Sequence, residues 1–203
     1  LGDIMTEGKI VILDTTLRDG GQTLGVDFSC ADKIAIAQSL DEIGIDYIEA
    51  GWPGANPIDN AFFDTPPKLG SSKLVAFGMT RRGGFSAAND PGLNAVINAK
   101  TDASCLVGKT WDFHVETALN TTLDENLDMI CQSVKAAIKL GRETMFDCEH
   151  FFDGYKHNRS YCLDCVQAAQ DGGASWVILC DTNGGSLPNE IFEIVSEVKN
   201  QKP

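Results

Sequence analysis

The sequence predicts an α/β fold built from repeated strand–helix units, a (β/α)8 TIM barrel truncated to about six βα units. Two observations predict it. Short apolar runs alternate with longer helical patterns, and successive runs end 28 to 41 residues apart, which leaves room for one crossover helix each time. The first run is followed by TTLRDGGQ, not by the G-x-G-x-x-G turn that would favour a doubly wound dinucleotide-binding sheet.

Six strands are expected. Several of the runs, such as LVAF and WVIL, are continuously apolar, as in parallel strands that are covered on both faces. The predicted strands are residues 9–14, 46–50, 73–78, 103–107, 143–148 and 175–180.

Four longer helices are expected between and after these strands, at residues 29–43, 123–140, 161–170 and 188–198. The first has apolar residues at helical spacing, ending with Ile43. Ser29 is its predicted N-cap, with Asp32 at the third helical position, and Gly44 follows its end. Pro188 suits the first position of the last helix.

A complete barrel has eight units and about 250 residues, so about two units are expected to be absent from these 203 residues. Residues 1–8 are predicted to be a short N-terminal tail. Residues 9–203 are predicted to form one incomplete barrel domain without an internal linker.

The composition excludes several classes of protein. The formal charge is −13, and there is no basic run that would attract a phosphate backbone, so nucleic acid is not an expected partner. No stretch approaches the ~20 apolar residues that span a bilayer, and the N-terminus lacks the apolar core of a signal peptide. The 7 cysteines are an odd number scattered through apolar segments, which indicates reduced thiols in a cytoplasmic protein.

Polar residues gather where the predicted strands end, which is where barrel enzymes carry their active sites. A carboxylate beside an arginine there can bind a hard divalent ion, while the guanidinium holds a carboxylate or a developing alkoxide. The residues concerned are Arg18, Asp19, Glu49, Arg81, Arg82, Lys109, Glu149, Asp181 and Thr182.

Five segments carry a family resemblance, in order and over about residues 9–200. Residues 13–22 (LDTTLRDGGQ) resemble the opening motif of the 2-isopropylmalate synthase, homocitrate synthase and HMG-CoA lyase superfamily. Residues 51–57 (GWPGANP), 108–115 (GKTWDFHV), 149–156 (EHFFDGYK) and 179–185 (LCDTNGG) are similar to its (R)-citramalate synthase branch.

The resemblance implies a TIM-barrel, HMGL-like acyltransferase that condenses acetyl-CoA with pyruvate to give (R)-citramalate and CoA, on the isoleucine route of branched-chain amino-acid biosynthesis. It also implies a homodimer and a divalent metal cofactor, Mg²⁺ or Mn²⁺, with Zn²⁺ as an alternative. A 2-isopropylmalate or homocitrate synthase acting on another 2-keto acid, or an acyl-CoA lyase, stays open as an alternative, because a pocket discriminates one methylene by only about 1–3 kcal/mol.

By the same resemblance, Asp19 matches the metal ligand, with a turn aspartate as the alternative. Arg18 is expected to face the ketone oxygen, with a surface ion pair as the alternative. Glu49 orients a substrate or relays a proton, or simply pairs with Arg18. Glu149 handles a proton or orients the ketone, or is a solvent-exposed strand-end acid.

Thr182 resembles a threonine that holds the keto-acid carboxylate, or it caps the following turn, and Gln22 is expected to bind substrate. Arg82 and Lys109, with Arg81, are candidate contacts for the phosphates of CoA, or ordinary loop cations. The family's His-x-His metal pair lies on the seventh strand, which these residues do not include. The 203-residue chain alone is therefore expected to bind metal weakly or not at all. Whether it is active by itself, or is a non-catalytic fragment, stays open at this point.

Overall fold

The computed structural model describes residues 10–201 and contains one six-stranded parallel sheet in the order β1-β2-β3-β4-β5-β6. Each strand therefore pairs with the strand next to it in sequence, as in a barrel, whereas a doubly wound sheet reverses its order at a switch point. This order confirms the predicted fold class, with six of the eight units of a complete barrel. The strands are β1 Leu13–Asp14, β2 Tyr47–Gly51, β3 Lys73–Met79, β4 Ala103–Lys109, β5 Glu143–Glu149 and β6 Trp176–Leu179.

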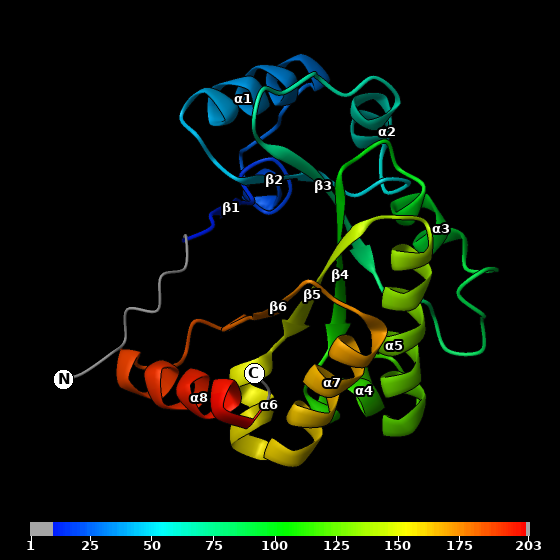
Figure 1. Ribbon diagram of the computed structural model, residues 1–203, viewed down its shortest axis with the longest axis vertical. Helices are drawn as coiled ribbons and strands as arrows, with labels where there is room; N and C mark the ends of the chain where they lie inside the picture. Colours follow the sequence, from blue (N-terminus) through cyan, green and yellow to red (C-terminus); the bar gives the residue numbers. More distant parts are fainter. Residues whose placement is uncertain (1–9, 202–203) are drawn as a thin grey trace.

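Eight α-helices and one 3-10 turn connect the strands within the described residues. In Figure 1 the helices lie around the outside of the curved sheet, whose concave side opens between β1 and α8. Their bounds are η1 Gly20–Gln22, α1 Cys30–Glu42, α2 Pro57–Asp64, α3 Pro91–Ile97, α4 Asp112–Thr117, α5 Leu123–Lys139, α6 Phe151–His157, α7 Arg159–Gly172 and α8 Pro188–Gln201.

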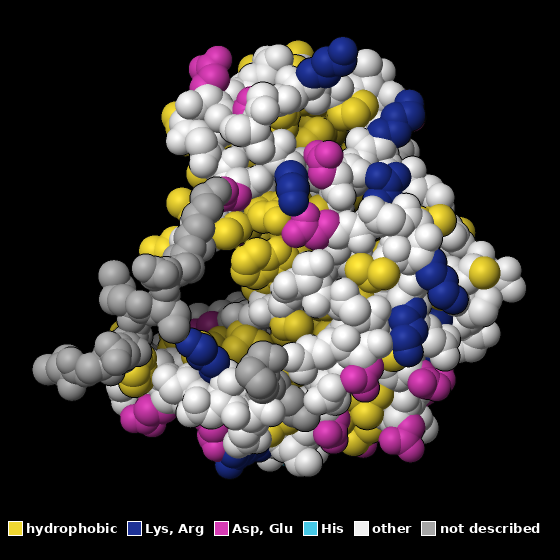
Figure 2. All heavy atoms as spheres, viewed as in Figure 1, with side chains coloured by type: hydrophobic (Ala, Val, Ile, Leu, Met, Phe, Trp, Pro, Cys, Tyr) yellow, Lys and Arg dark blue, Asp and Glu magenta, His cyan; other side chains and the backbone are white. Residues whose placement is uncertain are grey.

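Apolar side chains fill both faces of the sheet. The outer cluster lies between strands and helices and includes Phe62, Ile130 and Phe146, all with no exposed surface. Each such side chain stabilises the fold by about 1.5–3 kcal/mol relative to an exposed one. A smaller cluster lies on the concave face and consists of Tyr47, Val75, Phe77, Ala103, Cys105 and Met145. Figure 2 shows hydrophobic side chains gathered in the hollow that this face forms.

The predicted helix ends are confirmed in detail at α1. Ser29 Oγ accepts the backbone N–H of Asp32, and the Asp32 carboxylate accepts the backbone N–H of Ser29, which is a complete capping box. Gly44 follows the helix at φ +86°, a left-handed conformation that glycine adopts without strain. The prediction that Ile43 belongs to the apolar face of this helix was wrong. Ile43 is 74% exposed, because it lies one residue beyond the end of the helix at Glu42.

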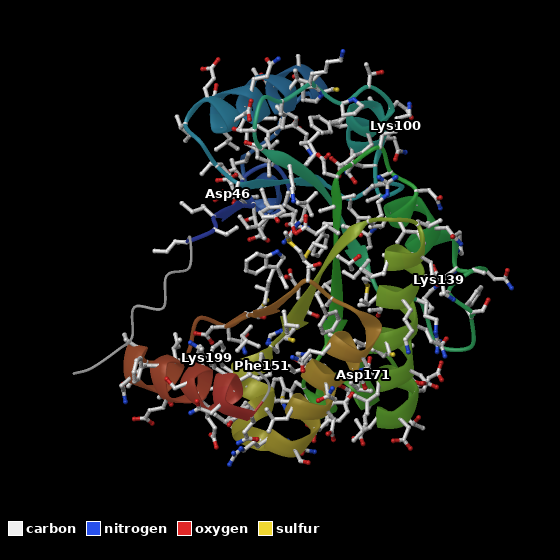
Figure 3. The ribbon with its side chains drawn as sticks, in the orientation of Figure 1. Asp46, Lys100, Lys139, Phe151, Asp171 and Lys199 are labelled. Atoms are coloured by element: carbon white, nitrogen blue, oxygen red, sulfur yellow. The ribbon has the colours of Figure 1, made fainter. Side chains whose placement is uncertain are left out.

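The first strand is shorter than predicted. Leu13–Asp14 are the register partners of β2. Before them, the Ile12 carbonyl accepts the N–H of Tyr47 at 3.0 Å, and the Ile12 N–H donates to the Asp46 carboxylate at 3.0 Å, beside β1 in Figure 3. β1 has a single neighbour in the described sheet, so nothing extends its ladder on the other side. Lys9 and the predicted tail lie outside the described residues. None of the helices in residues 10–201 combines the length and apolar character needed to cross a bilayer.

Candidate active site

The predicted site residues lie within, at or just after the carboxyl-terminal parts of the strands, whose carboxyl ends meet at one edge of the parallel sheet. The structure places them in three groups. Arg18 contacts both Asp19 and Glu49, Lys109 contacts Glu149, and Thr182 contacts the backbone after β5.

Arg18 is the centre of the first group. The turn after β1 fixes its backbone, because the N–H groups of Arg18, Asp19 and Gly20 all donate to the carbonyl of Thr15. Its Nε lies 2.6 Å from Glu49 Oε1 and its Nη1 3.1 Å from Asp19 Oδ1. The guanidinium also lies over the Phe77 ring, 3.9 Å from the ring centroid. Glu49 and Asp19 thus hold the edge of the guanidinium, and Phe77 packs against its face, which fixes its orientation.

Glu49 is wholly buried in β2. Burial raises its pKa to about 7, which the Arg18 charge opposes and the neighbouring Asp147 charge reinforces. The ion pair with Arg18 is the structural alternative that the sequence left open, and it is present. Direct substrate contact by a carboxylate with no exposed surface would require movement of its neighbours, so a proton-handling role stays a prediction.

Two further side chains belong to this group, and the sequence analysis missed both. Asp147 of β5 and Cys105 of β4 are buried on the concave face with Glu49, and one ligand atom from each of the three lies within 4.8 Å of the others. It is the single cluster of potential metal-ligating atoms that residues 10–201 contain. Side chains two residues apart in a strand lie on the same face, so Asp147 faces the same side of β5 as Glu149. This alternation is the signal in the sequence that could have identified Asp147.

Asp19 is the residue to which the sequence assigned a metal. Its side chain is 63% exposed, and its Oδ1 bonds Arg18 Nη1 at 3.1 Å. A hard, accessible carboxylate at the strand ends fits a divalent cation as one oxygen ligand. It belongs to no group of three ligating side chains within the described part of the chain, so Asp19 supplies one position of a coordination sphere.

The second group joins the last residues of β4 and β5, which are register partners. Lys109 Nζ lies 2.5 Å from Glu149 Oε2, and both side chains are partly exposed. Glu149 is therefore neither isolated nor fully solvated. Lys109 reaches across the strands toward the site and is not a free loop cation.

The third group fixes the backbone beside Glu149. His150 is in the left-handed region at φ 56°, a strained conformation for a residue other than glycine. Its N–H donates to Thr182 Oγ1 at 2.8 Å, so Thr182 connects the loops after β5 and β6. The Thr182 hydroxyl still has a proton to donate. In the turn that follows, Asp181 accepts the N–H of Ser186 at 3.1 Å.

Gln22 lines a cavity of about 220 Å³ beside Arg18, between the β1–α1 loop and the loop after β2. Trp52 and Phe28 form apolar walls of this cavity. At its base, Lys33 is buried, donates to the Ala50 carbonyl at 3.0 Å and forms an ion pair with Asp59. This pair could not be predicted from the sequence, because Lys33 falls among the apolar positions of a helix.

The two arginines after β3 differ in their surroundings. Arg81 is buried and bonds Glu125 at 2.7 Å and Gln132 at 3.0 Å, which makes it part of the packing between β3 and α5. Arg82 has a side chain that is 59% exposed and pairs with the buried Asp90 at 2.9 Å. Of the two, only Arg82 has a side chain open to an outside ligand.

The structure thus has a parallel barrel-type sheet that carries an arginine, an accessible carboxylate and a lysine–glutamate pair at its strand ends. The family model described as HMGL-like matches residues 9–203. The chain belongs to the HMGL-like family.

Curated relatives share the sequence at high identity. It is 53% identical over 195 residues to an (R)-citramalate synthase of Aquifex aeolicus (strain VF5) and 48% identical over 192 residues to one of Geobacter sulfurreducens. A probable 2-isopropylmalate synthase of Methanopyrus kandleri is 32% identical over 190 residues. The alignments cover 95%, 94% and 94% of this chain, which spans 37%, 36% and 36% of the length of those relatives.

Solved structures of low sequence identity share the fold. The HMG-CoA lyase of Bacillus subtilis superposes with a TM-score of 0.78 at 19% identity, over 96% of this chain and 65% of that one. The hydroxymethylglutaryl-CoA lyase of Pseudomonas aeruginosa gives 0.77 at 17% identity, over the same shares. At such identities the likeness establishes the fold alone.

Proposed function

We propose that the protein containing this chain is an acyltransferase that condenses acetyl-CoA with pyruvate and water to give (R)-citramalate and CoA. The observation that carries the proposal is the fixed Arg18 guanidinium beside the accessible Asp19 carboxylate at the strand ends. The identity of 53% to a curated (R)-citramalate synthase supports this reaction over its relatives.

The reaction needs three things from the protein. The thioester methyl group must lose a proton, its carbon must attack the ketone, and the ketone oxygen must receive a proton or a counter-charge as it becomes an alkoxide. Water then releases CoA from the thioester. Arg18 meets the third need in this proposal, because a guanidinium held in place stabilises the developing oxyanion without reorganising.

Glu149 and Lys109 are placed to handle the proton. In the proposal Glu149 accepts or returns a proton beside the ketone, while Lys109 keeps its carboxylate in position at 2.5 Å. Thr182 donates its hydroxyl hydrogen to the keto-acid carboxylate, and Gln22 contacts substrate from the wall of the cavity beside Arg18.

Asp19 is the proposed ligand for a divalent cation, Mg²⁺ or Mn²⁺, with Zn²⁺ as the alternative. When bound, such an ion supplies Lewis acidity and holds the keto acid by its oxygens. Asp19 belongs to no group of three His, Cys, Asp or Glu side chains in residues 10–201 that could hold an ion together, so the proposal draws the further ligands from the substrate, from water and from other residues of the complete protein.

The thioester is proposed to enter along the cavity that Trp52, Phe28 and Gln22 line, which places its methyl group near Arg18. Arg82, with its exposed guanidinium, and Lys109 are the proposed contacts for the phosphates of CoA. The overall charge of −13 repels a polyanion, so binding depends on a few such cations.

We further propose a cytoplasmic homodimer that works in isoleucine biosynthesis. The seven cysteines are all free in the structure, as in proteins of a reducing compartment. Sedimentation of the complete protein tests the oligomeric state directly.

The test of the reaction is release of free thiol by the complete protein with acetyl-CoA and each of several 2-keto acids. We expect pyruvate to be preferred over 2-ketoisovalerate and the product to be (R)-citramalate. Preference for the branched keto acid would assign a 2-isopropylmalate synthase. Cleavage of 3-hydroxy-3-methylglutaryl-CoA without condensation would assign a lyase.

A further inference from the structure

Two side chains of opposite charge are buried together behind the loop that follows β2. Lys33 comes from α1 and Asp59 from the first turn of α2, and they form an ion pair at the base of the cavity beside Arg18. Their side chains are 7% and 9% exposed. The attraction within a buried ion pair often fails to repay its desolvation, so the pair is not explained by stability alone. None of the roles proposed above uses either residue.

Further hydrogen bonds join this ion pair to the end of β2 and to the loop that follows it. Lys33 Nζ donates to the Ala50 carbonyl at 3.0 Å. Asp59 Oδ2 accepts the backbone N–H of Trp52 at 2.9 Å and the side-chain amide of Asn56 at 3.0 Å. The ion pair therefore ties α1 and α2 to the backbone at the point where β2 ends.

The end of β2 is irregular where the ion pair holds it. Between Glu49 and Gly51 the strand advances two residues while β3 advances one, as in a β-bulge. Gly51 has φ +152°, and a Cβ at this position would lie 2.7 Å from Asp59 Cγ. The carboxylate therefore packs directly on the strand backbone. Bulges beside active sites aim the side chains that follow them, and the next residue here is Trp52.

The indole ring of Trp52 is fixed as well as its backbone. Its ring stands edge-on to the Phe77 ring, with centroids 5.7 Å apart and planes at 84°, and the Phe77 ring is the one beneath the Arg18 guanidinium. A Cβ at Gly78 would lie 3.1 Å from Trp52 Nε1, so glycine at this position gives the indole room against β3. Contacts at both the backbone and the ring make Trp52 a rigid wall of the cavity.

We propose that Trp52 limits the size of the acyl group that the cavity admits, and that Lys33 and Asp59 are positioning residues that hold it in place. The inference rests on the proposed function, in which the thioester lies in this cavity with its acyl end near Arg18. A fixed wall rejects a longer acyl chain, because the indole cannot turn aside without losing its contacts. In a hydrophobic pocket one methylene changes kcat/KM by about 10- to 200-fold.

The walls of the cavity suit the acyl group of the thioester better than they suit the keto acid. Trp52, Phe28 and Ile58 present apolar surface to it, which an uncharged acyl group can contact without losing hydrogen bonds. At its base the Lys33 ammonium is engaged by Asp59 and by a backbone carbonyl. Thr182, the proposed partner of the keto-acid carboxylate, lies on the loop after β6 and outside the lining of this cavity.

The first test compares two thioesters as substrates of the complete protein, by release of free thiol with pyruvate. We expect Trp52→Leu to raise the ratio of kcat/KM for propionyl-CoA to that for acetyl-CoA by about tenfold or more, because a smaller wall leaves room for one more methylene. Trp52→Phe should raise the same ratio by less. The preference for pyruvate over 2-ketobutyrate should stay as in the wild type in both variants, since the keto acid lies elsewhere.

The second test addresses the positioning residues. Asp59→Asn leaves one acceptor oxygen, which cannot take the place of the two oxygens that now serve Lys33 and the Trp52 N–H. We expect a higher KM for acetyl-CoA and a rise in the propionyl-to-acetyl ratio smaller than in Trp52→Leu, with the KM for pyruvate unchanged. Lys33→Met should act in the same direction, and Lys33→Arg should stay closer to the wild type.

Glu143→Gln is the matched control for a lost ion pair. Glu143 pairs with Lys73 at the amino-terminal ends of β5 and β3, away from the cavity. This variant should lower the urea midpoint and leave the propionyl-to-acetyl ratio as it is in the wild type. A ratio in Asp59→Asn equal to that of the wild type, together with a lower urea midpoint, would overturn the positioning role and leave the pair a purely structural element.

Calorimetric binding of acetyl-CoA and propionyl-CoA separates this inference from the proposed function. A wild type that binds acetyl-CoA but releases no thiol with pyruvate would reject the proposed function, and the relative affinity of Trp52→Leu for the two thioesters would still decide the inference. If Trp52→Leu does not fold, Trp52→Phe decides it by the same ratio.

Three results would overturn the role of Trp52. One is a propionyl-to-acetyl ratio that is unchanged in its variants, in turnover and in binding. Another is a change confined to the preference between pyruvate and 2-ketobutyrate, which would place Trp52 beside the keto acid. The third is a wild type that condenses acetyl-CoA and propionyl-CoA equally well, which would mean that no wall limits the acyl group.

Discussion

Lys109 Nζ and Glu149 Oε2 lie 2.5 Å apart, and the two residues are register partners at the ends of β4 and β5. The lysine therefore belongs to the same strand-end site as the glutamate. The sequence analysis expected Lys109 to contact CoA and Glu149 to handle a proton, as two separate roles, and this bond couples the two residues. They can be separated by kinetics.

A double-mutant cycle measures this relationship. We expect Lys109→Gln to lower kcat because Glu149 loses the cation that positions it, and the effect to be smaller once Glu149→Gln is present. A coupling of about 0.5–3 kcal/mol in the activation free energy is typical of residues in contact. Additive effects, with a rise confined to the KM for acetyl-CoA, would instead assign Lys109 to CoA alone.

Arg18 is expected to be the most sensitive residue of the site. Arg18→Ala should lower kcat by about 10²–10³, as loss of an oxyanion donor does. Arg18→Lys should recover little, because an ammonium cannot bond Glu49 and Asp19 while keeping the planar contact with Phe77. The measurement is free thiol released from acetyl-CoA with pyruvate. Arg159→Lys is the matched control, because Arg159 pairs with Glu197 and has no role in the proposed site.

Near-normal turnover in Arg18→Ala would contradict its proposed role. A folding defect is separated from a catalytic one by the far-ultraviolet circular dichroism spectrum and the urea midpoint of the same variant.

The strands could be predicted from the sequence because each is a short apolar run of fixed spacing, and the sheet order then followed from the barrel. The helices α2 and α3 were missed because they have only 8 and 7 residues, too few to show a period. Their signal was local. In both, a capping side chain precedes a proline at the first helical position, as Asn56 and Asp90 do.

The site was predictable in part for a similar physical reason. Residues that follow the strands, such as Arg18 and Glu149, can be located once the strand ends are known. Asp147 and the Lys33–Asp59 pair could not, because their surroundings depend on which strands are neighbours and on which face a side chain lies. The exposure of Ile43 depends in the same way on where the helix ends.

Asp41 should make stability depend on acid pH. Its carboxylate accepts the N–H groups of Gly70, Ser71 and Ser72 at 2.6, 2.9 and 2.7 Å, which joins the end of α1 to the segment before β3. These bonds, with Gly70 the strongest, hold the pKa of Asp41 far below its ordinary value of 3.8. Because the folded pKa is the lower one, the stabilisation is fully present above 3.8 and is lost as the pH falls through the folded pKa.

Asp41→Asn should therefore lower the urea midpoint of the complete protein at neutral pH, and its difference from the wild type should shrink in acid. Asp128→Asn, an exposed residue of α5, should change stability by no more than about 0.5 kcal/mol. A difference between Asp41→Asn and the wild type that is the same at neutral and acid pH would show that these bonds do not depend on the charge.

Gly154 allows α6 to pack directly against the chain that follows β4. A Cβ at this position would lie 2.8 Å from the Thr110 carbonyl oxygen, 2.9 Å from Trp111 Cα and 2.8 Å from Cys162 Sγ. Two of these are backbone atoms that cannot turn aside, so Gly154→Ala must move the helix. We expect a loss of about 1–3 kcal/mol in the free energy of unfolding. We also expect a lower kcat, because α6 begins directly after Glu149 and His150.

Gly185→Ala is the matched control, since a Cβ there meets no atom within 4 Å and its φ is outside the left-handed region. Equal urea midpoints for the two variants would mean that α6 does not lie as close to residues 110–111 as the structure has it. A lower kcat in Gly154→Ala without any loss of stability would locate the effect in the Glu149 backbone alone.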